Sequence, residues 1–138
     1  MPIQFYTEDI DFKFFGVRKT TSWIKEVIAS EGASLLSITY IFCSDDYLLK
    51  INTDFLAHHT YTDIVTFDNS EEPGKIDADI FISIERVKEN AAKYNVSFEE
   101  ELHRVIIHGV LHLVGYKDKS ASQKSLMRKK EDSYLSLR

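Results

Sequence analysis

The feature that most constrains this chain is a long apolar segment that begins after Ser97. Ser97 and Glu100 have the spacing of a capping box, so a helix is predicted to start here. At about 100° per residue, one stripe of this helix is apolar throughout, made of Phe98, Leu102, Val105, Ile106, Gly109 and Leu113. Beyond Arg104 the other faces are apolar as well, which is typical of a helix buried inside the protein.

Two histidines, His108 and His112, interrupt this apolar surface. They are four residues apart, hence about 40° apart around the helix and about one turn apart along it, so both imidazoles can reach one ion. Gly115 predicts a left-handed helix end that returns Asp118 to the same point. Two nitrogens and one carboxylate oxygen, with a fourth position left to water, are typical of a catalytic zinc site. One zinc ion per chain would activate that water and polarise the bond under attack, which predicts a hydrolase.

The alternative is that His108 and His112 are core histidines that bind the backbone separately. The pair favours a metal, because two buried imidazoles without an ion would need separate partners. Zinc proteases carry Glu directly after the first histidine, whereas this chain has Gly109, which counts against a peptidase. Glu101 shares the helix face but lies about 10 Å before His108, too far to act unaided as a base. No catalytic group beyond the metal-bound water is therefore predicted.

The 138 residues and their 43% hydrophobic content predict one domain spanning residues 1–138. The order of elements predicts an α+β fold, or α/β in looser usage, with a mixed sheet of about four strands packed with about five helices. Strands are expected at 3–6, 35–43, 62–67 and 78–84, with a hairpin loop at 69–75 between the last two. Helices are expected at 20–30, 45–55, 85–94, from 97 onward, and at 121–135.

Composition narrows the class of protein further. No apolar run reaches the length of a membrane span and no signal peptide begins the chain, so a cytoplasmic protein is expected. The one cysteine, Cys43, lies in an apolar run and is expected to be a buried thiol. The net charge of −5 argues against an indiscriminate nucleic-acid binder, yet the segment from Lys117 to Arg138 has seven basic and three acidic residues. Solvated helix lysines or a phosphate-attracting rim would both explain that basic end.

The segment HGVLHLVGYKD, residues 108–118, closely resembles the signature of the YbeY family of bacterial metal-dependent endoribonucleases. TDIVTF followed by ADIFIS is similar to that family's strand pair, and INTDFL is similar to the helix end before it. The resemblance implies a zinc-dependent, single-strand-directed endoribonuclease in small-subunit rRNA maturation and ribosome quality control. Its partners would be single-stranded RNA and the small ribosomal subunit. It places His108, His112 and Asp118 on the three metal positions, the third of which is more often histidine.

One departure from the family pattern concerns catalysis. The helix before TDIVTF usually carries an arginine implicated in activity, and Leu56 occupies that place here. The cations that could substitute for it, or that could be ordinary surface charges, are Lys50, Arg86, Arg104 and Lys117. A ribosome-assembly factor that binds RNA and has a mainly structural metal site is therefore the alternative function. A hydrolase acting on a peptide is weaker, because the glutamate is absent.

Several polar and aromatic residues remain open to two interpretations. Tyr116 and Lys117, in the turn between presumed ligands, are the candidate RNA contacts. His58 and His59 could face the metal or RNA, or could lie in an exposed loop. The residues expected at the openings of the two hairpin strands, which could be general bases or turn caps, are Asp63 and Asp79. The other aromatic residues that could stack on bases, or pack in the core, are Tyr61, Phe67 and Phe81.

Overall fold

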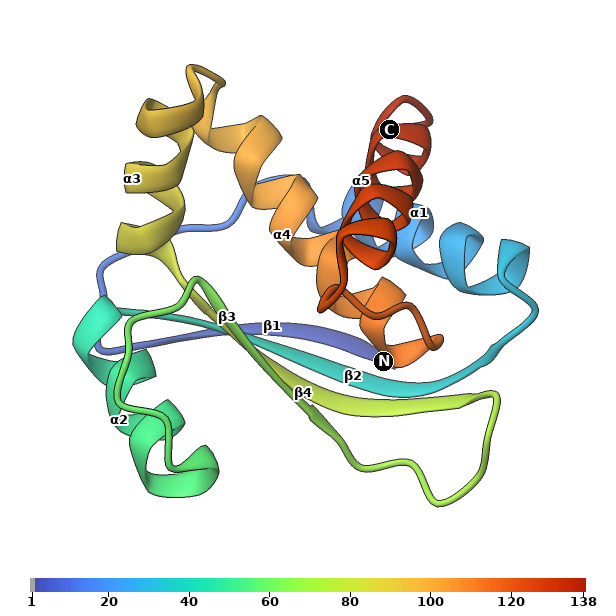
Figure 1. Ribbon diagram of the computed structural model, residues 1–138, viewed down its shortest axis with the longest axis horizontal. Helices are drawn as coiled ribbons and strands as arrows, with labels where there is room; N and C mark the ends of the chain where they lie inside the picture. The colour runs from blue at the N-terminus through green and yellow to red at the C-terminus, as the bar shows by residue number, and fades with distance from the viewer. Residues whose placement is uncertain (1) are drawn as a thin grey trace.

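The computed structural model describes residues 2–138, in which four strands form one mixed sheet in the order β1-β2-β4-β3 (Figure 1). The strands are β1 (Ile3–Glu8), β2 (Ser34–Cys43), β3 (Ile64–Asp68) and β4 (Lys75–Ser83). Strands β1, β2 and β4 are parallel, whereas β3 pairs antiparallel with β4. The predicted hairpin is confirmed, and the antiparallel β3 places the loop before it beside the end of the sheet.

Five helices accompany the sheet within the described residues, which confirms the α+β prediction. They are α1 (Val17–Ser30), α2 (Asp45–Leu56), α3 (Ile84–Tyr94), α4 (Phe98–Leu113) and α5 (Ala121–Leu135). Most ends lie within two residues of the predicted ones. Strand β4 begins three residues earlier than expected, because Lys75 and Asp77 still pair with β2 despite being polar. None of these helices is long and apolar enough to cross a membrane.

The helices lie on both faces of the sheet (Figure 1), with α1, α3, α4 and α5 on one side and α2 on the other. Successive side chains of β4 point to opposite faces of the sheet. Ile80 and Ile82 lie in the main core, whereas Phe81 packs against a second cluster under α2. Phe67 joins Phe81 there, so core packing describes both rings. Cys43 lies in the same cluster, where burial raises the pKa of its thiol to about 12. The expected buried thiol is confirmed.

Helix α4 is the central element, as its all-round apolar sequence predicts. Ile106, Ile107 and Val110 are fully buried in the main core. At Gly109 the helix approaches the sheet so closely that an added Cβ would lie 3.0 Å from Cδ1 of Ile64 and 3.2 Å from Cδ1 of Ile80. The residue that stands where zinc proteases carry glutamate therefore faces the sheet.

Candidate metal centre

The turn after α4 is built as the sequence predicts. Gly115 has a φ of +115°, which lets the chain reverse. Its N–H donates to the carbonyl of His112 at 3.1 Å, and the Tyr116 N–H donates to that of Leu111 at 3.0 Å, the two bonds of a Schellman motif. A capping box at Ser120 then starts α5. The loop that carries Asp118 is thus held at both ends by backbone geometry.

This turn brings His108, His112 and Asp118 together, and we call these three residues the donor triad. The two Nε2 atoms are 3.0 Å apart, and Oδ2 of Asp118 lies 3.3 Å from each of them. In a tetrahedral zinc site with bonds of about 2.0–2.1 Å, neighbouring donors lie about 3.3 Å apart. The donor triad could therefore hold a metal ion. The alternative of separate backbone partners is wrong, because these rings contact each other and carboxylates.

A buried carboxylate on α5 orients the first histidine. Oε2 of Glu131 lies 2.6 Å from Nδ1 of His108, and Oε1 accepts a hydrogen bond from Arg104 at 2.9 Å. Burial alone would lower the pKa of His108, but its hydrogen bond and attraction to Glu131 outweigh burial and raise that pKa. A proton held at Nδ1 leaves Nε2 free to face the other two donors.

Sequence reasoning missed Glu131. A signal existed, because Met127, Glu131 and Tyr134 have the spacing of one helix face and all three are buried. A carboxylate on a buried stripe needs a partner, which points to a nearby histidine or arginine. Its partner lies 23 residues earlier in the chain, and no local pattern identifies it.

Two clefts meet at the donor triad. The larger, which we call the large cleft, has a volume of about 770 Å³, and beside the triad it is lined by Leu56, His58, Tyr61, Asp63 and Lys119. The smaller, which we call the small cleft, has a volume of about 280 Å³ and is lined by Asp63, Glu101, Arg104, His108, Asp118 and Glu131, among others. Residues from α2, the following loop, β3, α4, the turn before α5 and the middle of α5 thus surround one open site.

The two aspartates predicted near the hairpin behave differently. Asp63 precedes β3 and lines both clefts, and burial raises the pKa of its carboxyl, an effect partly opposed by His108. Asp79 lies in the middle of β4, where it accepts a hydrogen bond from Asn69 at 3.1 Å. The expectation that Asp79 opens a strand is wrong, because β4 starts at Lys75. Of the two, Asp63 alone lines the clefts beside the donor triad.

Glu101 lies about two helical turns before His108 on α4, as its sequence spacing predicts. Its side chain is buried and lines the small cleft with His108. Burial and then repulsion by Asp63 raise the pKa of its carboxyl. Glu101 therefore belongs to the surroundings of the site, although nothing in the geometry places it against the donor triad.

The two candidate RNA contacts, Tyr116 and Lys117, lie in different surroundings. Tyr116 donates its hydroxyl to Glu31 at 2.7 Å and lies under the Lys130 ammonium, so it fastens the loop to α1 and α5. Lys117 is exposed beside it. His58 lines the large cleft, and His59 is exposed in the same loop. The RNA-binding roles of Tyr116 and Lys117 stay predictions.

Two of the four cations named as possible substitutes for the missing arginine already form ion pairs with carboxylates. Arg86 binds Asp45 at 2.6 Å, and Arg104 binds Glu131 and Asp132. Lys50 is exposed on α2. Lys119 follows Asp118 directly, but sequence reasoning missed it. Its side chain lines the large cleft, as does Leu56.

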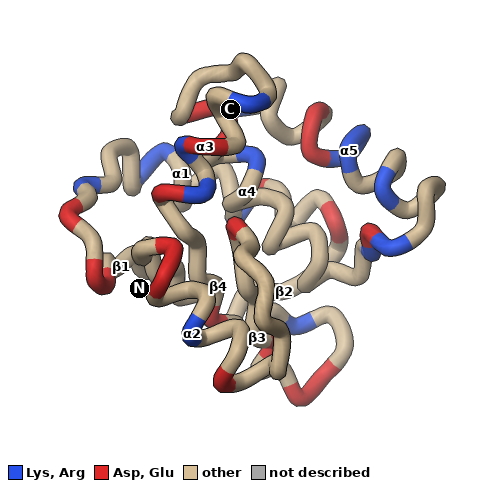
Figure 2. Tube along the Cα trace, turned by 60° about the vertical axis from the view of Figure 1, so that its left-hand side comes forward, with Lys and Arg blue, Asp and Glu red and all other residues tan. Residues whose placement is uncertain are grey.

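The basic end of the chain therefore has two parts. Lysines and arginines recur along α5 (Figure 2), and most of them are exposed. Lys130 instead pairs with Glu31 at 3.3 Å, and Arg138 lies over the ring of Trp23. The exposed lysines of α5 agree with the first explanation. The phosphate-attracting rim stays a prediction, for which Lys119 is the lysine that lines the large cleft.

Comparisons with known proteins agree with this geometry. A family model described as Endoribonuclease YbeY matches residues 3–137. A Cytophaga hutchinsonii protein named Endoribonuclease YbeY is 52% identical over 99% of this chain and 95% of its own length. One of the same name from Bacteroides thetaiotaomicron is 41% identical over the full length of both chains. A solution structure of a Thermotoga maritima protein superposes with a TM-score of 0.66 at 28% identity, covering 96% of this chain and 86% of that one.

Proposed function

Because the chain belongs to the Endoribonuclease YbeY family, we propose that it is a zinc-dependent endoribonuclease that cleaves single-stranded RNA. The observation that supports zinc is the donor triad, with separations of 3.0 and 3.3 Å beside an open cleft. A closed structural site would use four protein ligands, whereas three leave one position for substrate or solvent. Asp118 in place of a histidine keeps an acceptable zinc donor.

The chain's own residues would divide the chemistry as follows. When bound, zinc polarises a phosphoryl oxygen and acidifies a coordinated water. Glu131 holds the proton on Nδ1 of His108, and Lys119 offers a positive charge to a phosphate in the large cleft. Asp63 is the carboxylate at the cleft that would take the proton from the attacking hydroxyl, either of water or of the ribose itself.

The products distinguish the two nucleophiles. Attack by the ribose 2′-hydroxyl expels the neighbouring 5′-oxygen and leaves a 2′,3′-cyclic phosphate, whereas attack by water leaves a linear phosphate. Mass spectrometry of the fragments at early times would identify the end group. A cyclic phosphate that never appears, even transiently, would exclude the ribose hydroxyl as nucleophile.

The biological substrate we propose is small-subunit ribosomal RNA in the cytoplasm, during its maturation and during quality control of ribosomes. The family resemblance supports this assignment. Depletion of the protein should cause unprocessed small-subunit rRNA ends to accumulate, which primer extension would measure. Normal ends in depleted cells would contradict the rRNA assignment while leaving RNA cleavage in vitro intact.

Variants of the donor triad test the enzyme itself. His112→Ala and Asp118→Ala should each lose bound zinc and RNA cleavage, as measured by elemental analysis and by cutting of a single-stranded oligonucleotide. His59→Ala is the matched control, because His59 is an exposed histidine in the loop before β3. Wild-type protein, purified without chelators, that holds no stoichiometric metal would overturn the proposal.

A second candidate function is a ribosome-assembly factor that binds RNA and whose metal site is structural. Leu56 favours it, because this residue lines the large cleft where the family resemblance leads us to expect an arginine implicated in activity. The same His112→Ala variant separates the two functions. Unchanged folding with lost cleavage supports the enzyme, whereas loss of the fold in a protein that never cleaved RNA supports the assembly factor.

A further inference from the structure

The loop between α2 and β3 presents a large aromatic side chain at the rim of the large cleft. Tyr61 is 51% exposed, although tyrosines usually bury most of the ring. Its side chain lines the same cleft as the donor triad and His58. The alternative that Tyr61 packs in the core is therefore wrong, and its exposure next to the site calls for a different explanation.

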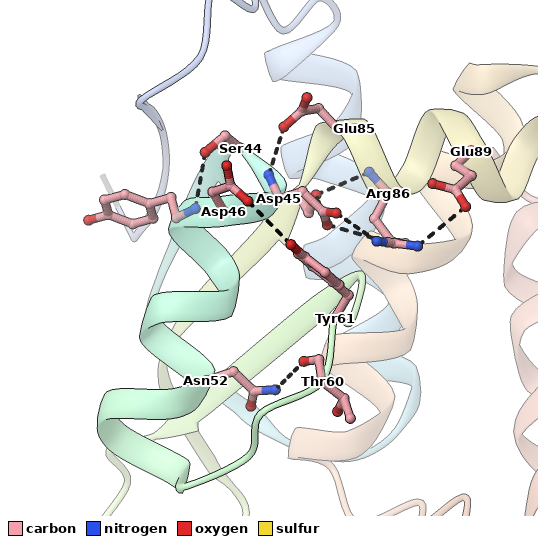
Figure 3. Close-up of polar contacts among 11 residues, drawn as sticks. Ser44, Asp45, Asp46, Asn52, Thr60, Tyr61, Glu85, Arg86 and Glu89 are labelled. Atoms are coloured by element: carbon pink, nitrogen blue, oxygen red, sulfur yellow. Dashed lines mark hydrogen bonds and ion pairs between the residues drawn. The ribbon is translucent and has the colours of Figure 1, made fainter.

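The loop that carries Tyr61 is held in place by α2 (Figure 3). The side-chain amide of Asn52, a buried residue, donates to the carbonyl of Thr60 at 3.0 Å, and the Thr53 hydroxyl donates to the carbonyl of His58 at 3.0 Å. The His58 N–H in turn donates to the carbonyl of Asn52 at 3.1 Å. These bonds fix the backbone before Tyr61, and the Ser83 N–H holds the carbonyl of Asp63 after it at 2.9 Å, so the ring is positioned before any ligand arrives.

Arg86 supports the ring from α3. Its guanidinium lies 5.0 Å from the ring centroid of Tyr61, within the range of a cation–π contact. The guanidinium is itself fixed by Asp45, at 2.6 and 3.3 Å, and by Glu89 at 3.4 Å (Figure 3). The Tyr61 hydroxyl points toward Asp46, with an oxygen separation of 3.4 Å. Arg86 is thus occupied as a support and is not free to bind a phosphate.

These contacts point to stacking as the way in which the cleft holds its ligand. Every nucleobase has an apolar face that stacks on an aromatic ring, and each such contact contributes about 1–3 kcal/mol. The chain has a net charge of −5, so general attraction of phosphates is weak and contacts with bases gain in relative importance. A base is accessible to stacking where RNA is single-stranded, which matches the proposed substrate.

We propose that Tyr61 is the platform on which one unpaired nucleobase of the RNA stacks, beside the phosphodiester that faces the donor triad. This inference rests on the proposed endoribonuclease function and names the residue that selects single-stranded substrate. The Tyr61 side chain loses little conformational entropy when a base binds, because the loop and Arg86 already hold the ring in place. Stacking is tolerant of base identity, so this contact selects strandedness and not sequence.

The test compares Tyr61→Leu, Tyr61→Phe and wild-type zinc-loaded protein on one single-stranded oligonucleotide. Tyr61→Leu, which keeps apolar bulk without a π face, should raise KM roughly 5- to 150-fold, corresponding to about 1–3 kcal/mol, with kcat little changed. Tyr61→Phe should stay close to wild type. Tyr6→Leu is the matched control, because Tyr6 has the same exposed fraction of 51% but lies on β1. Zinc content and thermal midpoint should not change.

Two readouts exclude a merely structural role. A substrate series with one abasic nucleotide moved along the strand should contain one position at which wild type and Tyr61→Leu have equal KM. An oligonucleotide with 2-aminopurine at that position should lose fluorescence on binding to wild type and Tyr61→Phe, and keep it with Tyr61→Leu. The platform would be overturned if Tyr61→Leu and wild type had equal KM on the intact strand. It would also be overturned if the KM of Tyr61→Leu exceeded that of wild type by the same factor on every abasic substrate.

The fluorescence experiment also keeps the two proposals separable. Wild-type protein that quenches 2-aminopurine but cuts no RNA would contradict the nuclease and support the platform. Wild-type protein that cuts RNA with no contribution from Tyr61 would contradict the platform and support the nuclease.

Discussion

Glu131 determines which nitrogen of His108 can act as a donor. The carboxylate is buried against Nδ1 of His108 and is balanced by Arg104, so its charge has defined partners on both sides. Carboxylates that hold a ligating histidine in this way orient the ring and increase its basicity. The strength of the proposed metal site therefore depends on a residue that donates nothing to the metal.

We expect Glu131→Gln to weaken zinc binding about 10- to 100-fold, because the amide cannot replace the charge that holds the His108 proton. Competition with a chromophoric chelator measures the affinity without reference to activity. Asp132→Asn is the control, since Asp132 binds Arg104 at 2.7 Å but does not contact His108. Equal affinities for Glu131→Gln and wild type would show that Glu131 does not orient His108.

Lys119 is the cation that we expect to contact RNA phosphate at the site. Lys119→Ala should weaken RNA binding uniformly across sequences and should reduce the slope of log K against log salt by about 0.7, the value for one phosphate contact on a single strand. Titrations at several salt concentrations give the slope. Lys129→Ala, an exposed lysine of α5, should leave the slope unchanged. A slope that is identical for Lys119→Ala and wild type would assign the phosphate contact elsewhere.

Among the elements, α4 contributes most to positioning the site. Its buried residues pack on the sheet and on the neighbouring helices, and its last two turns supply both histidines of the donor triad. The close approach at Gly109 keeps those histidines next to β3 and to Asp63, which precedes that strand. The position of the site relative to the sheet therefore depends on the absence of a side chain at residue 109.

Gly109→Val should destabilise the fold by about 1–3 kcal/mol, because its Cβ and methyl groups would press on Ile64 and Ile80. The free energy of unfolding in urea measures this cost. Helix propensity alone would favour valine over glycine, so a loss of stability at residue 109 reports the steric contact. Ala92→Val, at an exposed position of α3, is the control for valine in a helix without such a contact and should cost no more than roughly 0.5 kcal/mol. A Gly109→Val protein as stable as wild type would show that the sheet yields at this contact.

Across the whole molecule, the C-terminal end is fastened to α1 around one tryptophan. The indole N–H of Trp23 donates to the carbonyl of Tyr134 at 2.9 Å, and the Arg138 guanidinium lies over the ring. His103 of α4 meets the same ring edge-on, with centroids 6.1 Å apart. Burial first, and then repulsion by Arg138, lower the pKa of His103 to about 4. His103 is therefore neutral in the folded protein at neutral pH.

Acidification should loosen this junction. The pKa of His103 is lower in the folded than in the unfolded chain, so its contribution to stability is complete above about pH 6.5 and is lost as the pH falls toward 4. The loss amounts to at most about 3 kcal/mol. His103→Gln should show a shallower fall in unfolding free energy between pH 6.5 and pH 4, measured by urea denaturation at each pH. Parallel curves for the two proteins would contradict the assignment.

The features that were predictable from the sequence depend on neighbours along the chain. Helix α4, its Ser97 N-cap, the Gly115 turn and the hairpin are specified within a few residues each, because helix period, caps and turns are local properties. The capping box predicted for α4 forms only in part, because the Glu100 N–H donates to Ser97 but the Glu100 side chain does not return to the Ser97 N–H. The same locality explains why His108, His112 and Asp118 could be brought together in advance: two are one helical turn apart, and the third follows a glycine reversal. The family resemblance also rests on these segments.

Packing between distant segments decided the rest. The strand order β1-β2-β4-β3, the contact of Glu131 with His108 and the support of Tyr61 by Arg86 each join residues from separate elements, and no spacing in the sequence encodes them. Asp79 shows the same limit, since its place inside β4 followed from pairing with β2. Local rules thus determined which groups could meet a metal, whereas burial and partner choice in three dimensions determined which residues orient them and which face the cleft.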